Sequence, residues 1–275
     1  MERGPSTTAM GSAVLRAAHV REDAPPWVLE DEIAESFLDE ESRRRLREEI
    51  ADWAPEVRAA FRLAHAVRSR VAEDVAVAGL DEGRRAYVLL GAGLDSFAWR
   101  HPSADRFEIW EIDHPATQEW KRRALAAHRL AEPGNVRFVP VDLGETPVAE
   151  VATPREATWS WLGVTMYLER STTADVLRAI ADHDPGTTVV VNFALAAEEL
   201  DALSDAVRVT AAAVVRRAGE PVRGTYRRAE CEEMLWAAGF SSVVLLDAAT
   251  LCERYFPGRR ELRLPDSTLL CVARV

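Results

Sequence analysis

The sequence predicts an α/β fold: a mostly parallel, seven-stranded sheet with helices on both faces, preceded by an N-terminal helical cap. Two observations lead to this prediction. Up to about residue 80, apolar residues recur at three- and four-residue steps, as they do in amphipathic helices. Beyond residue 80, short apolar runs alternate with helical segments, and this alternation is typical of βαβ units in a parallel sheet.

Residues 1–80 are expected to form the helical cap, as part of the same domain as the sheet. The first ten residues are polar and are expected to be loose, and the helical pattern runs from Gly11 to about Val77. Gly79 is expected to cap the last of these helices, because glycine readily adopts the left-handed conformation that ends a helix.

Residues 81–275 are expected to form the sheet domain. "AYVLL" at 86–90 is a continuous apolar run, the signature of a strand covered on both faces. The expected strands are 86–90, 107–113, 136–142, 157–162, 187–193, 241–247 and 268–275. The expected helices are 115–131, one from Ser171, a long one from Ala194 to about Ala218, and 228–239.

Composition narrows the classes of function. A net charge of −11 argues against nucleic acid or an anionic membrane surface as a partner. Three scattered cysteines, without metal-ligand spacing, indicate a reducing cytoplasm and no metal site. We therefore expect a cytoplasmic monomer or homodimer whose partner is a small molecule.

The carboxyl ends of the strands predict the ligand site, because open parallel sheets bind ligands there. The first strand ends in Gly91-Ala92-Gly93, where small residues let a ligand approach the backbone. The second ends in Asp113, 20 residues beyond Gly93, the spacing at which a carboxylate commonly binds ribose hydroxyls. The third ends in Asp142-Leu143, which suits an adenine amine and ring. Taken singly, Asp113 could instead cap the following helix, and Asp142 could be a turn residue.

The glycine turn differs from a dinucleotide fingerprint. Ser96 replaces its third glycine, and Asp95 places a carboxylate where a pyrophosphate would require N–H groups. These two residues disfavour an NAD-type dehydrogenase and suit a cationic or uncharged group. An adenosine without phosphates and with a positive centre is S-adenosyl-L-methionine (SAM).

Four segments, "LLGAGLDSFAWR", "WEIDHPATQEWKRRAL", "RFVPVDLGE" and "WSWLGVTMYLERST", carry a family resemblance. They resemble the leucine carboxyl methyltransferase-like family of class I SAM-dependent methyltransferases, in particular its actinobacterial and polyketide carboxyl O-methyltransferase branch. The resemblance spans residues 12–197. It implies a Rossmann-like class I methyltransferase fold, SAM as cofactor and S-adenosyl-L-homocysteine as product.

The resemblance also implies roles for particular residues. Arg68 matches an arginine that holds the SAM carboxylate, with Arg70 as the alternative if the match is shifted. Tyr167 matches a tyrosine that positions substrate near the entrance. The other implied cofactor-binding residues are Gly91, Ala92 and Gly93 at the methionine moiety, Asp113 at the ribose, His114 beside the adenosine, and Asp142 with Leu143 at the adenine.

One position departs from the family pattern. Where the family usually has a glutamate near the SAM amino group, this sequence has Leu162. An ammonium group facing leucine loses a charge-assisted hydrogen bond, worth about 1.5–3 kcal/mol.

The acceptor is expected to be a carboxyl group, because His101, His114 and His183 form no His–carboxylate constellation that would serve as a base. The sequence thus predicts carboxyl O-methylation, and the resemblance implies that the acceptor is a small, polyketide-like secondary metabolite. The alternative is a SAM-fold protein with lost or altered methyl transfer, which Leu162 supports. The aromatic residues that could wall an apolar substrate pocket are Trp27, Trp53, Phe61, Trp159 and Trp161.

Overall fold

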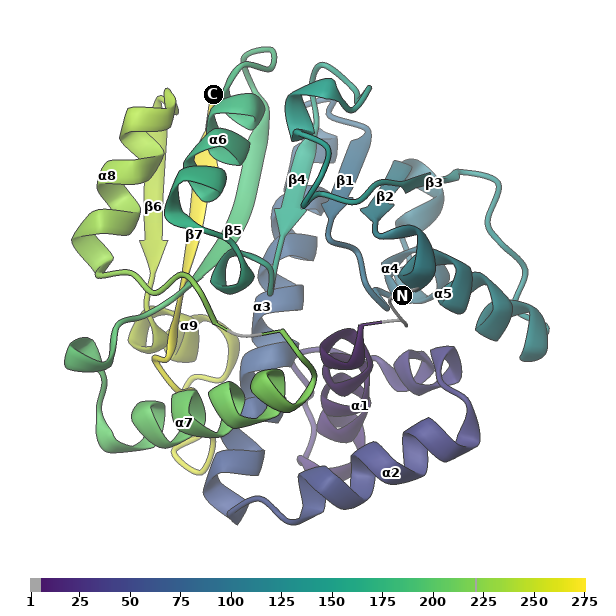
Figure 1. The fold of residues 1–275 in the computed structure, drawn as a ribbon, viewed down its shortest axis with the longest axis vertical. Helices are drawn as coiled ribbons and strands as arrows, with labels where there is room; N and C mark the ends of the chain where they lie inside the picture. The colour runs from purple at the N-terminus through teal and green to yellow at the C-terminus, as the bar shows by residue number, and fades with distance from the viewer. Residues whose placement is uncertain (1–5, 221) are drawn as a thin grey trace.

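A computed structural model describes residues 6–220 and 222–275, and a seven-stranded sheet forms its centre (Figure 1). The strand order is β3-β2-β1-β4-β5-β7-β6, and only β7 runs antiparallel to its neighbours. The strands are β1 (Ala86–Leu90), β2 (Glu108–Asp113), β3 (Val136–Pro140), β4 (Thr158–Trp161), β5 (Thr188–Ala194), β6 (Ser242–Leu246) and β7 (Thr268–Arg274). All seven predicted strands and the mostly parallel sheet are confirmed.

Helices cover both faces of the sheet. On one face, α6 (Arg170–Ala181) and α8 (Arg228–Ala238) pack against the central strands in an apolar cluster that includes Trp159 and Trp161. On the other face lie the 27-residue helix α3 (Pro55–Asp81), the short α4 (Phe97–Arg100) and α9 (Ala248–Tyr255). α5 (Pro115–Ala127) connects β2 to β3. The alternating apolar runs of the sequence therefore become the two buried faces of one sheet.

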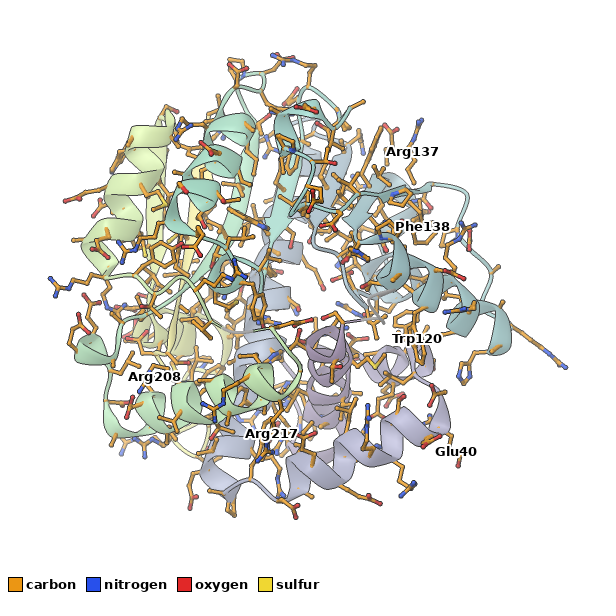
Figure 2. The ribbon with its side chains drawn as sticks, in the orientation of Figure 1. Glu40, Trp120, Arg137, Phe138, Arg208 and Arg217 are labelled. Atoms are coloured by element: carbon orange, nitrogen blue, oxygen red, sulfur yellow. The ribbon has the colours of Figure 1, made fainter. Side chains whose placement is uncertain are left out.

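A cap of helices crosses the carboxyl ends of the parallel strands. It consists of α1 (Thr7–Glu22), α2 (Glu40–Ala51) and α7 (Ala202–Arg217), which lie together below the sheet in Figure 1. α1 packs on α3, and Trp120 of α5 donates to the carbonyl of Phe37 in the 3-10 helix Glu32–Phe37, 3.1 Å away (Figure 2). This arrangement places α1 directly over the predicted ligand site.

Buried ion pairs join the cap to the sheet. Arg16 of α1 pairs with Asp31 at 2.7 Å and donates to the Leu94 carbonyl in the glycine turn at 2.6 Å. Arg100 pairs with Asp31 and with Glu73 of α3. Because these charges have partners, their burial holds α1, α3 and the glycine turn in one arrangement.

Helix boundaries differ from the prediction at the N-terminus and after α3. α1 begins at Thr7 because the Ser6 side chain accepts from the Ala9 N–H, so Thr7–Met10 are helical rather than loose; residues 1–5 lie outside the described residues. Gly79 does not cap α3, which continues to Asp81. Its missing side chain makes room for the Arg84 guanidinium, 2.9 Å from where a Cβ would stand.

The predicted long helix from Ala194 is wrong in its first turns. β5 extends through Ala194, which pairs with Thr268 of β7. α7 begins at Ala202, because the preceding Asp201 caps it by accepting from the Ser204 N–H. The prediction omitted α9, whose eight residues include a single buried one, Leu251, too few to show a periodicity. No helix among the described residues is long and apolar enough to cross a bilayer.

Candidate cofactor site

Two glycines shape the turn after β1 because neighbouring side chains leave no room for a Cβ. Gly91 has φ +70°, and a Cβ there would lie 2.5 Å from Val164. Gly93 has φ +53°, and a Cβ there would lie 3.1 Å from that of Ala9 in α1. Residues with a side chain rarely adopt a positive φ, so the turn requires glycine at both positions.

Asp113, at the end of β2, faces this turn. One carboxylate oxygen accepts from the Gly93 N–H and the other from the His114 N–H, the latter at 2.6 Å. Burial raises the pKa of Asp113 above its usual 3.8, although the two backbone donors oppose the shift. Asp113 thus ties β2 to the glycine turn, and binding of a ribose by the same carboxylate stays a prediction.

Asp95 and Ser96 stabilise the turn and make no contact that marks them as ligand-binding residues. The Asp95 carboxylate accepts from the Phe97 N–H at 2.8 Å, and its backbone carbonyl accepts from Lys121 at 2.6 Å. Ser96 accepts from Arg100 at 2.9 Å. The sequence interpretation that Asp95 suits a cationic ligand thus gains no support, because the contact made by that carboxylate is with the backbone at the start of α4.

Arg68 of α3 extends toward the strand ends and donates to Ser12 of α1 at 3.1 Å. Within the described residues, no carboxylate pairs with it. Burial lowers its pKa from 12.5 to about 10, and nearby Arg16 adds to the shift. Arg70, the alternative, is exposed and pairs with Asp74 at 2.7 Å. Of the two arginines, Arg68 alone offers an unpaired charge to an anionic ligand.

Tyr167 lies in the 3-10 helix Thr165–Tyr167, which follows β4. Its hydroxyl contacts the Thr8 side chain, and burial raises its pKa to about 12. At neutral pH the phenol is therefore protonated and available as a hydrogen-bond donor, which fits positioning rather than proton abstraction.

Asp142 and His114 lie together beside β3, at the other end of the site. His114 caps α5 by accepting from the Ala116 N–H through Nδ1, and its Nε2 is 3.6 Å from Asp142 Oδ2. The prediction that none of the three histidines pairs with a carboxylate is therefore wrong for His114, whose Nδ1 is occupied by the helix cap. The remaining Asp142 oxygen accepts from the Gly144 N–H at 2.9 Å. Both side chains are about one-third exposed, so they border solvent as the edge of an adenine site would. Leu143, also partly buried, packs against the sheet core.

Asn192 of β5 is a polar residue of this region that the sequence analysis missed. The fully buried side chain accepts from the Gly163 N–H at 2.7 Å, and its main-chain carbonyl accepts from Thr165. Its Nδ2 has no hydrogen-bond partner among the described residues. Gly163 in turn borders Arg68, 3.4 Å from the position of a Cβ. Asn192 thus fixes the turn that carries Gly163 and Val164 into the site.

The other histidines predicted as candidate bases, and two of the predicted pocket-wall residues, contact residues outside the candidate site. His101 stacks on Phe97, and His183 bonds with Thr153 and Ala179. Trp159 and Trp161 are fully buried under α6 and α8, so they are core residues and not pocket walls.

Three of the predicted aromatic residues lie on the cap side. Trp53 packs on Phe61 with ring centroids 4.8 Å apart, and Trp27 donates to the Asp23 carbonyl. Next to Phe61 on α3 is His65, another residue that the sequence analysis missed. Its pKa is lowered well below 6.5 by burial and by Arg68, so its imidazole is neutral.

Comparison with known proteins identifies the fold and the family. Residues 9–181, more than half of the chain, match the model of the family described as "Leucine carboxyl methyltransferase". The chain belongs to the leucine carboxyl methyltransferase family. The predicted family, enzyme class (a SAM-dependent methyltransferase) and cofactor are confirmed at this level, whereas the polyketide branch and the acceptor stay predictions.

Relatives extend this result beyond the matched residues. The chain is 29% identical to a Bacillus subtilis protein provisionally named S-adenosyl-L-methionine-dependent methyltransferase YktD, over 93% of both chains. A Mycobacterium tuberculosis protein with the same provisional description is 32% identical, over 50% of this chain and 46% of its own. The crystal structure of a provisionally assigned O-methyltransferase from Nostoc punctiforme superposes with a TM-score of 0.52 at 16% identity, covering 80% of this chain and 60% of that one. This structural likeness supports the class I methyltransferase fold alone.

Leu162, the departure from the pattern of the leucine carboxyl methyltransferase family, packs into an apolar cluster between α3 and the sheet. Its neighbours in that cluster include Leu63, Val67 and Leu270. Leucine at this position therefore has a packing role, and the end of β4 contributes no side-chain carboxylate to the site.

Proposed function

We propose that this protein is a SAM-dependent O-methyltransferase that methylates a carboxyl group of a small, polyketide-like metabolite. One observation carries the proposal: a tight glycine turn, the strand-end carboxylate Asp113 and the unpaired guanidinium of Arg68 meet at the carboxyl edge of the sheet. SAM has a matching group for each, since it carries a ribose, an aliphatic chain and a carboxylate.

The residues present fit the proposed cofactor. The backbone of the glycine turn would border the methionine chain, while Val164 and Ala9 occupy the space directly over Gly91 and Gly93. Asp113 would bind the ribose hydroxyls, and Arg68 the carboxylate. Asp142 and Leu143 border the position proposed for the adenine. A carboxylate beside Arg68 would remove the cost of holding a partly buried cation without a partner, which is a physical reason for ligand binding at this position.

A second feature that bears on the acceptor is a polar cavity. A cavity of about 530 Å³ opens where β5 ends, a volume within the usual range for small-molecule sites. Arg208 of α7 lies on this side of the molecule (Figure 2). The charged residues lining the cavity are Arg170, Arg208, Arg227, Glu198 and Glu230. Each of these arginines pairs with a carboxylate, Arg170 with Glu230, Arg227 with Glu198 and Arg208 with Asp205, so the cavity is polar but holds no excess of cations.

The chemistry needs little from the protein beyond alignment. When bound, SAM supplies an electrophilic methyl group on a sulfonium. A carboxylate acceptor with a pKa near 4 is already ionised at neutral pH and needs no base. The chain's contribution is to hold acceptor and cofactor in line, and such positioning can supply about 7–11 kcal/mol. Tyr167, protonated at neutral pH, can orient an acceptor oxygen by donating a hydrogen bond.

Transfer of a radiolabelled methyl group to a panel of small carboxylic acids and phenols tests the proposal. Base treatment separates the two product classes, because methyl esters release methanol and methyl ethers do not. The proposal predicts base-labile label on one or more acids and none on phenols. Base-stable label would move the acceptor to a hydroxyl group.

The second candidate is a SAM-fold protein whose methyl transfer is lost or altered. It is favoured by Leu162, which leaves the end of β4 without a carboxylate for the SAM ammonium group. That candidate predicts binding of S-adenosyl-L-homocysteine with no label transferred to any acceptor.

A further inference from the structure

We propose that Glu220, in the segment following α7, binds the ammonium group of SAM and thereby supplies the carboxylate that the end of β4 lacks. The inference rests on the proposed function, because it assumes SAM as the ligand. It adds a cofactor-binding residue from a part of the chain far from the other predicted site residues in sequence.

Glu220 is held in place by a hydrogen bond to α1, the helix that covers the glycine turn. Glu220 Oε2 accepts from the Thr8 hydroxyl at 2.6 Å. Thr8 precedes Ala9, the residue whose Cβ packs against Gly93 in the glycine turn. Glu220 therefore bonds to the residue next to the one that covers Gly93, and α1 links Glu220 to the turn proposed to bind the methionine moiety.

The other carboxylates around the site have partners of their own. Both oxygens of Asp113 accept backbone N–H groups, and one oxygen of Asp95 accepts the N–H of Phe97 in α4. Asp142 lies beside β3, at the end of the site proposed for adenine. Glu220 has one oxygen bonded to Thr8, and within the described residues its Oε1 makes no hydrogen bond. Asp95 keeps one free oxygen as well, and Glu220 differs from it in its contact with Thr8 of α1, the helix that covers the glycine turn.

The charges of Arg68 and Glu220 match the two charged groups at the amino acid end of SAM. The amino acid end of SAM is a zwitterion, with a carboxylate and an ammonium group on one carbon. Arg68 and Glu220 have opposite charges, and both act electrostatically on Tyr167, which lies close to each. A zwitterion beside Tyr167 can thus direct its carboxylate to Arg68 and its ammonium group to Glu220.

A purely structural role predicts a different outcome. The Thr8–Glu220 hydrogen bond also joins α1 to the segment after α7, and it could serve only to close the cap. In that case, removing either partner would affect every adenosine ligand equally. 5′-Methylthioadenosine distinguishes the two roles, because it keeps the adenosine and sulfur but lacks the amino acid end.

The test is calorimetric titration of S-adenosyl-L-homocysteine and 5′-methylthioadenosine into wild type, Glu220→Gln and Thr8→Val. We expect Glu220→Gln to weaken S-adenosyl-L-homocysteine binding about 10-fold or more, as for loss of a charge-assisted hydrogen bond, with 5′-methylthioadenosine unchanged. Thr8→Val should change either affinity by less than about 3-fold, since the Glu220 charge remains. Equal losses for both ligands, or no loss for either, would overturn the inference.

The wild-type affinities separate failure of this inference from failure of the proposed function. If wild type binds neither ligand, the proposed function itself fails. If wild type binds both and Glu220→Gln does not discriminate between them, only the role of Glu220 fails.

Discussion

Replacing Arg68 with methionine should stabilise the free protein while weakening its ligand binding. The pKa of Arg68 falls from 12.5 to about 10 because the side chain is partly buried without a carboxylate partner. The unfolded chain therefore binds this proton more tightly than the folded protein does. Below pH 10 the full penalty applies, and at 1.36 kcal/mol for each pKa unit it is about 3 kcal/mol. It disappears only as pH rises toward 12.5.

The Arg68→Met variant loses the hydrogen bond to Ser12, which offsets about 1 kcal/mol of this gain. We therefore expect a net stabilisation of about 1–2 kcal/mol, or a rise of a few degrees in melting temperature. Binding of S-adenosyl-L-homocysteine should weaken about 10- to 100-fold because a charge-assisted bond is lost. 5′-Methylthioadenosine, which has no carboxylate, should bind as before.

Differential scanning calorimetry and titration of the same samples provide both readouts. Arg70→Met is the matched control: Arg70 is exposed and paired with Asp74, so its loss should cost under about 1 kcal/mol and leave ligand binding unchanged. A large fall in the melting temperature of Arg68→Met, together with unchanged S-adenosyl-L-homocysteine affinity, would refute the reasoning.

Three further predictions concern other parts of the structure. Asp113→Ala should weaken S-adenosyl-L-homocysteine and 5′-methylthioadenosine alike, because both carry the ribose; unchanged titration isotherms would contradict the ribose assignment. Lys121, the only lysine of the chain, is fully buried against Glu111 at 2.7 Å, so Lys121→Met should cost about 3–5 kcal/mol in urea unfolding. The exposed pair of Arg122 and Glu132 is its control, with under about 1 kcal/mol for Arg122→Ala, and equal losses would argue against a special role for burial. Asn192→Ala leaves the Gly163 N–H without its partner and should cost about 1–3 kcal/mol in the same assay, whereas full stability would show that the turn is held by other contacts.

The sheet could be predicted from sequence because its strands are buried on both faces. A continuous apolar run such as Ala86–Leu90 reads as a covered strand without any knowledge of its neighbours. The same reasoning failed where tertiary contacts set a boundary. Ala194 is a good helix former, yet it continues β5 because Thr268 pairs with it.

From local sequence patterns, the candidate site was predictable only where its residues follow a strand, whereas Arg68 on α3 was predicted from the family resemblance. Asp113 and the glycine turn stand at strand ends, and the structure brings them into contact. Asn192 lies inside a strand, and Glu220 lies beyond α7 with no motif around it. Asn192 reaches the site through the turn after β4, and Glu220 through α1, and no local pattern encodes either contact. Asp95 shows the converse: a carboxylate that looked ligand-directed accepts the N–H of Phe97 in α4.

Titration of S-adenosyl-L-homocysteine into the wild-type protein tests the central claim most directly. The account predicts saturable binding to one site per chain, tighter than about 1 mM. NAD should not compete, because the turn lacks the third glycine of a pyrophosphate site. No detectable binding of S-adenosyl-L-homocysteine, or its displacement by NAD, would contradict the assignment of this site to SAM.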